Sequence, residues 1–114
     1  MKMSYEQLDV YQYALQLLRQ LTRLSQAVKK DHRELSDQLF RASLSLSLNI
    51  AEGSGKSSKS EQKRFFGIAR GSAMECGALI DALFVLELVS TQEAQEMKTL
   101  LTRIAAMLSA LILR

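Results

Sequence analysis

Four cationic side chains lie close together in the middle of the sequence, at Lys56, Lys59, Lys63 and Arg64, beside the Gly/Ser-rich stretch 52–60. Lysine and arginine attract phosphate oxygens, and the free amides at the start of a helix do the same. A run of charges is also typical of a solvated helix face. Both interpretations stay open: a phosphate-binding cluster or a solvated turn between helices.

The tripeptide Gly55, Lys56, Ser57 matches the end of a phosphate-binding P-loop. That motif requires another glycine five residues before Gly55 and a strand that leads into it. The required position is Ile50, within a segment whose pattern is helical. We therefore interpret the tripeptide as part of a flexible turn.

No other residues form a recognisable chemical site. His32 is the only histidine and Cys76 the only cysteine, so they supply no metal-binding cluster. Nothing in the sequence places Glu52 and Glu75 together as an acid–base pair, and no nucleophile accompanies them. We expect a protein that is not an enzyme and has no cofactor or metal.

Composition indicates one small helical domain. The 114 residues are 47% hydrophobic and 24% charged, and proline and tryptophan are absent. Many of the residues are straight-chain helix formers. The unpaired Cys76 and the start of the chain, which does not resemble an export signal, predict a cytoplasmic location. The apolar stretches 78–89 and 100–113 are short and interrupted by charge, so we expect no membrane span. A net charge of +3 permits an acidic partner without requiring one.

Apolar residues recur at spacings of three and four through four segments, which predicts an all-α, up-down-up-down four-helix bundle over residues 1–114. We expect helices at about 5–28, 35–52, 58–89 and 91–113. Three pairs have the spacing of a helix-starting capping box: Ser4 with Gln7, Ser58 with Glu61, and Ser90 with Glu93.

The second segment contains an alternation, SLSLSLNI at 43–50, that locally suggests a strand. A lone strand would have no partner in this sequence, and the apolar residues around it step by four and three along one helical face. We therefore predict a helix. Asn49 lies on that face, and we expect it to be buried and hydrogen-bonded, because an unpaired polar group is costly there.

Apolar residues outnumber the positions that a bundle of this size can bury, which predicts self-association. The surplus residues are Leu44, Leu48, Phe66 and Phe84, which we expect to serve either contacts between copies or helix packing. Gly67 and Gly71 form a GxxxG step within the third helix, where each glycine costs about 1 kcal/mol relative to alanine. We expect another helix to approach this step closely, either within the bundle or from another subunit.

In an up-down bundle both termini lie at the same end as the turn between helices two and three. The cations of that end include Lys2, Lys56, Lys59, Lys63, Arg64 and Arg114, whereas residues 71–97 contain five carboxylates and no Lys or Arg. We expect an electrically polar molecule with a basic end that attracts phosphate. The next candidate for phosphate contacts is the face of helix one with Arg19, Arg23 and Lys30.

The sequence resembles the four-helix-bundle family of 23S rRNA intervening-sequence proteins. The family's pattern is similar to Gln38, Arg41, Ala42, Ser45, Asn49, Ile50, Ala51, Glu52 and Gly53, followed by Phe65, Ala69, Gly71, Ser72 and Glu75, and its first helix to 8–14. The chain departs from the family at Tyr11, where tryptophan is usual, and at 27–33, where a Phe-Pro turn is common. We interpret Arg41, Asn49 and Glu52 as structural polar residues of this pattern.

The resemblance implies a ring, commonly a pentamer, and a distant similarity to the accessory variability proteins of retroelements, which present basic surfaces to nucleic acid. It implies no catalytic residues. We therefore expect a homo-oligomer that binds RNA or DNA non-specifically through its basic end. The alternative is a protein–protein interaction scaffold without nucleic-acid binding.

Overall fold

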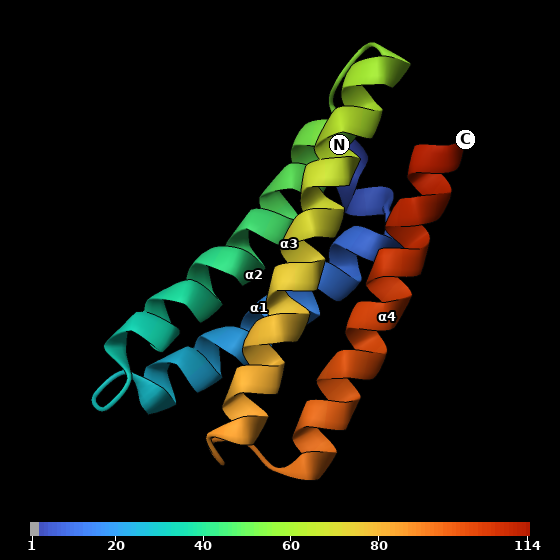
Figure 1. Cartoon of the computed structure of the whole chain (residues 1–114). Coiled ribbons are helices and arrows are strands. Elements are labelled where there is room, and N and C mark those ends of the chain that lie inside the picture. The colour runs from blue at the N-terminus through green and yellow to red at the C-terminus, as the bar shows by residue number, and fades with distance from the viewer. Residues whose placement is uncertain (1–2) are drawn as a thin grey trace.

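The computed structural model describes residues 3–114 as a short 3₁₀ helix, η1 (Ser4–Gln7), followed by four α-helices. These are α1 (Asp9–Val28), α2 (Arg33–Ser54), α3 (Lys59–Val85) and α4 (Thr91–Leu113). Figure 1 shows the four helices packed side by side, with sequence neighbours running in opposite directions. The molecule is elongated, at 44 × 23 × 22 Å. The all-helical prediction is confirmed for the described residues.

The first predicted helix is two elements, because Leu8 adopts an extended conformation (φ −87°, ψ 123°) between η1 and α1. The expected capping box of Ser4 and Gln7 is wrong. The Met3 amide instead donates to Glu6 Oε2 at 3.0 Å, and Ser4 Oγ lies 3.0 Å from Ser54 Oγ at the end of α2. A long-range contact therefore occupies the hydroxyl that local spacing assigned to a cap.

The alternating Ser/Leu run lies wholly within α2, as expected. Its serines satisfy their hydroxyls on the helix itself: Ser43 Oγ donates to the Leu39 carbonyl at 2.8 Å and Ser47 Oγ to the Leu44 carbonyl at 3.0 Å. Such back-bonding lets a serine be buried in a helix without an unpaired polar group. Ser43 and Ser47 are both buried.

The third helix ends at Val85, four residues before the predicted boundary. Glu87 has φ 60°, a left-handed conformation, and its amide donates to the Phe84 carbonyl at 3.0 Å. The Leu88 amide donates to the Leu83 carbonyl at 2.8 Å. This pair of bonds is a Schellman motif, which ends a helix and usually has glycine where Glu87 stands. Sequence analysis missed the end of α3 because that glycine is absent.

The core runs along the bundle axis and takes residues from all four helices. Its fully buried large side chains include Leu17, Leu21, Leu39, Leu46, Ile80, Met97, Ile104 and Leu108. α1 and α2 are fixed in register by Ser25 Oγ, which donates to the Ser36 carbonyl at 2.9 Å. None of the helices in the described part of the chain is long and apolar enough to cross a membrane.

Candidate nucleic-acid interface

The turn between α2 and α3 is the part of the molecule that carries the cation cluster. The Gly55 amide donates to the Glu52 carbonyl at 3.1 Å, and Ser58 Oγ accepts from the Glu61 amide at 3.1 Å, which starts α3 as its capping box predicted. Figure 1 shows that the α2–α3 hairpin extends beyond η1 and beyond the end of α4. The cluster is therefore presented to solvent at the tip of the bundle.

Gly53 and Phe66 anchor this hairpin. A Cβ atom on Gly53 would lie 2.7 Å from Cε1 of Phe66, closer than real Cβ contacts allow. Phe66 is 5% exposed and packs into the core of its own chain. The prediction of Phe66 as a surplus residue for self-association is therefore wrong, and its ring serves helix packing.

Phe65, which sequence analysis named only as part of the family's pattern, has its ring close to two of the cations. Lys56 Nζ lies 4.9 Å from its ring centroid and Arg64 Cζ lies 5.1 Å from it, both within cation–π range. The same cations form ion pairs, Lys56 with Glu52 at 3.4 Å and Arg64 with Glu61 at 3.5 Å. Phe65 directly follows Arg64 in the sequence, and this adjacency is the signal from which the contact could have been predicted. Lys56 and Arg64 are therefore positioned and partly neutralised by their neighbours.

Lys59 and Lys63 differ from these two. Lys59 is exposed and Lys63 half-exposed, and neither takes part in any ion pair among residues 3–114. Of the four cations in the predicted cluster, Lys59 and Lys63 are therefore the two that a phosphate can contact without displacing a carboxylate of the described residues. Lys2, which was assigned to the same end, lies outside the described residues.

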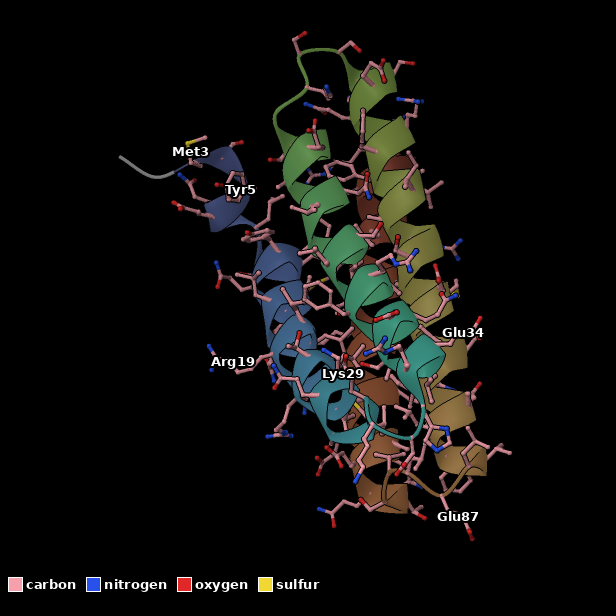
Figure 2. The ribbon with its side chains drawn as sticks, turned by 90° about the vertical axis from the view of Figure 1, so that its left-hand side faces the viewer. Met3, Tyr5, Arg19, Lys29, Glu34 and Glu87 are labelled. Carbon is pink, nitrogen blue, oxygen red and sulfur yellow. The ribbon has the colours of Figure 1, made fainter. Side chains whose placement is uncertain are left out.

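An open groove of about 420 Å³ lies beside the turn, and sequence analysis gave no indication of it. Met3, which precedes η1, and Tyr5 of η1 line one part of it, and Leu48, Glu52 and Lys56 line another. Figure 2 shows Met3 and Tyr5 at η1, next to the end of α2. The Tyr5 ring lies edge-to-face with Tyr11, with centroids 4.9 Å apart. An aromatic ring beside cations is the usual composition of a single-strand binding groove.

The expected charge separation between the two ends is weaker than predicted. The acidic residues at the α3–α4 turn share their end with Lys29, Lys30 and Arg33 of the α1–α2 turn. Two of the carboxylates are paired with cations outside 71–97: Glu93 with Arg23 at 3.4 Å and Asp81 with Lys98 at 2.6 Å. Pairing reduces the availability of Arg23, on the second candidate face, for a phosphate.

The residues considered for catalysis are not brought together. Glu52 is at the end of α2, whereas Glu75 follows Ser72, whose hydroxyl lies 3.0 Å from Ser45 Oγ near the middle of α2. At 1.5 Å per helical residue the two carboxylates are separated by roughly 15 Å along the bundle. Burial raises the pKa of the Cys76 thiol to about 12, which keeps it protonated and unreactive. The described residues contain no metal-binding group of His, Cys, Asp or Glu.

The predicted structural polar residues behave differently from one another. Asn49 is half-buried and donates from Nδ2 to the Ser45 carbonyl at 2.8 Å, so it is satisfied within its own helix. Glu52 is exposed in its pair with Lys56. Arg41 is also exposed, and no hydrogen bond to its side chain is found in the described chain, so a structural role for it is not supported.

The predicted packing glycines are open in this chain. A Cβ on Gly67 or Gly71 would meet nothing within 4 Å. Close approach of a helix within the bundle is therefore excluded as their reason, and approach of another subunit stays a prediction. Leu48 is 55% and Phe84 48% exposed, and Leu44 is half-buried.

A protein-family model matches most of the chain. The model of a family described as 23S rRNA-intervening sequence protein matches residues 6–110. The chain is also similar to a crystal structure from Bacteroides thetaiotaomicron, a protein of unknown function from the S23 ribosomal protein family. The TM-score is 0.83 and the identity 21%, over 90% of this chain and 97% of that one. At this identity the likeness shows the fold. No functionally curated protein matches the chain at a significant level.

Proposed function

The chain belongs to the family of 23S rRNA-intervening sequence proteins, and from that premise we propose that it is a non-enzymatic, homo-oligomeric helical bundle that binds RNA or DNA non-specifically through phosphates. The proposed contact surface is the α2–α3 end, with Lys56, Lys59, Lys63 and Arg64. The proposal rests above all on Lys59 and Lys63, two cations without an ion-pair partner in the described chain at the projecting tip.

Two further features support this proposal. Phe65 holds Lys56 and Arg64 at the same tip. Tyr5 and one cation of the cluster, Lys56, line the same groove, and an aromatic ring next to a cation suits a stacked base beside its phosphate.

A single copy carries few cations at this end, so the proposal includes self-association. Each added subunit repeats the cluster, and linked weak contacts bind a polymer far more tightly than one contact does. The exposed apolar residues Phe40, Leu48 and Phe84 support association between copies. We keep the pentamer as the proposed size because the family resemblance implies it.

The second candidate function is a protein–protein interaction scaffold without nucleic-acid binding. The observation that favours it is the same set of exposed apolar side chains, which a different protein could cover instead of a second copy. Binding measurements separate the two candidates.

The test is binding of the purified chain to a generic single-stranded RNA and a generic duplex DNA, followed by fluorescence anisotropy across a salt series. Phosphate contacts predict that affinity falls steeply as salt rises, with a slope of about −0.9 per contact on duplex DNA in a plot of log affinity against log salt. Failure to bind at about 20 mM salt, far below the range in which phosphate contacts are screened, would remove the nucleic-acid proposal and leave the scaffold.

A further inference from the structure

The outer face of the α1–α2 hairpin is covered by large apolar side chains. Phe40 is 44% and Leu48 55% exposed on α2. Leu44 lies between them on the same helical stripe and is half-buried. On α1 the side chains of Leu15 and Leu18 are also half-buried. Figure 2 looks directly onto this hairpin, and we call it the bulky face.

The opposite side of the molecule is hollowed. Between α3 and α4 lies a groove of about 310 Å³, whose lining includes the small residues Ala73, Gly77, Ala78 and Ala105 and the larger Met74 and Leu101. It continues toward the α3–α4 turn as a second hollow of about 570 Å³, with which it shares Asp81, Lys98 and Thr102. A Cβ on Gly77 would meet nothing within 4 Å, so the groove has room for a side chain. We call this side the grooved face.

Each hairpin has two halves along its length, and the net charges of these halves have opposite signs. On the α1–α2 hairpin, residues 3–18 and 42–58, toward the chain termini, contain one cation and three carboxylates, a net charge of −2. Residues 19–41, toward the α1–α2 turn, contain six cations and three carboxylates, a net charge of +3.

The α3–α4 hairpin has the reverse arrangement. Residues 59–70 and 99–114, toward the termini, contain six cations and one carboxylate, a net charge of +5. Residues 71–98, toward the α3–α4 turn, contain one cation and five carboxylates, a net charge of −4. At each end of the bundle, the two hairpins therefore carry opposite charge.

We infer that the bulky face of one copy docks into the grooved face of a second copy, with the two bundles parallel. This inference rests on the self-association in the proposed function and assigns its surfaces. In the parallel orientation both halves of the contact bring opposite charges together, −2 against +5 and +3 against −4. Phe40 and Leu48, the most exposed large side chains of the bulky face, then meet hollows that have space beside Gly77 and that also offer the apolar side chains of Met74 and Phe84.

Contacts between identical faces satisfy fewer of these conditions. When two bulky faces meet in parallel, halves of the same charge sign face each other. When they meet antiparallel, halves of opposite sign face each other, but large side chains then lie against large side chains. A contact between two different faces is heterologous, so an open assembly keeps one unused bulky face at one end and one unused grooved face at the other until it closes. The space beside Gly77 and the exposure of Phe40 and Leu48 then have one common explanation.

The experiment uses two variants of unchanged net charge. Phe40→Glu with Leu48→Lys places like charges against the two halves of the grooved face. Gly77→Arg with Thr102→Glu fills the groove, at positions that are open in the monomer. Ile68→Gln is the matched control, since Ile68 is 42% exposed but lies one turn before Ser72, on the side of α3 that meets α2.

Light scattering gives the mass of each variant, and circular dichroism checks that helicity is retained. We expect the wild type and Ile68→Gln to be oligomers and each double variant to be a monomer. An equimolar mixture of the two double variants should form a dimer of twice the monomer mass, because one intact bulky face meets one intact grooved face. A mixture that stays monomeric overturns the pairing of the faces.

Two other outcomes are equally decisive. A groove variant that remains oligomeric by itself would mean that the bulky face pairs with its own copy, which contradicts the heterologous contact. A wild type that is monomeric at micromolar concentration would refute the proposed self-association itself, whatever the faces do. Nucleic-acid binding is measured separately, so its failure does not affect this result.

Discussion

The turn between α2 and α3 and the turn between α3 and α4 are built with the same local chemistry and carry opposite charge. Ser58 accepts from the Glu61 amide at 3.1 Å, and Ser90 accepts from the Glu93 amide at 3.0 Å. Residues 52–64 contain four cations and two carboxylates, whereas residues 81–96 contain four carboxylates and no cation. Since the same cap forms in both settings, the cap itself does not depend on the cations of the first turn, and phosphate binding remains the role that we propose for them.

The two turns also differ in how they use the backbone. At the α2–α3 turn a glycine is needed for space, because Gly53 lies against Phe66. At the α3–α4 turn a glycine in place of Glu87 would remove backbone strain, because Glu87 has φ 60°. Substitutions at these positions can therefore test whether each turn is formed as described.

The largest stability effect is expected at Gly53. Gly53→Ala places a Cβ 2.7 Å from the Phe66 ring and should lower the free energy of unfolding by about 1–3 kcal/mol, as overpacking in a core does. The matched control is Gly67→Ala, where the Cβ meets nothing within 4 Å and better helix propensity should add about 0.5–1 kcal/mol. Urea denaturation measures both. Equal effects of the two variants would contradict the anchoring of the hairpin by Gly53.

The caps are expected to have intermediate and similar effects. Ser58→Ala and Ser90→Ala each remove one hydrogen bond to a first-turn amide and should each cost about 1 kcal/mol. The loss of unfolding free energy in the double variant should equal the sum of the two single losses, because Ser58, at the start of α3, and Ser90, at the start of α4, lie at opposite ends of the bundle. Thermal and urea unfolding of the three variants measure these costs. A cap whose removal leaves the free energy of unfolding unchanged would contradict the role given to it here.

The smallest effect is expected at Glu87. Glu87→Gly removes the left-handed strain of about 1 kcal/mol, and the greater chain entropy of unfolded glycine offsets part of that gain. We expect a net stabilisation of about 0.5 kcal/mol. Glu87→Ala controls for loss of the carboxylate and should give no such gain. A melting temperature lowered by the glycine would contradict the Schellman motif.

The helices themselves were predictable because periodicity and caps are local. The spacing of three and four placed all four α-helices, and the serine caps placed two helix starts. The end of α3 was missed since its stop signal lies in a backbone conformation that Glu87 adopts without glycine.

The features that sequence analysis missed depend on which residues meet across helices. The Ser4–Ser54 contact joins residues fifty positions apart and replaces the expected cap. The glycine that packing requires is Gly53, although the helical GxxxG step drew attention to Gly67 and Gly71. For the candidate site, sequence identified the four cations, but only their geometry separates Lys59 and Lys63 from Lys56 and Arg64, which have partners.

The central claim is that phosphate binds at the α2–α3 end, and a comparison of two charge variants tests it most directly. Lys59→Gln with Lys63→Gln and Lys29→Gln with Lys30→Gln change the net charge equally, at opposite ends of the bundle. Their masses are first checked by light scattering, and their binding to one RNA is then measured across a salt series. The account predicts that the first variant loses about tenfold or more in affinity at low salt and that its salt slope flattens by about one to two units, whereas the second stays near wild type. Equal losses in the two variants, or a loss confined to Lys29 and Lys30, would contradict it.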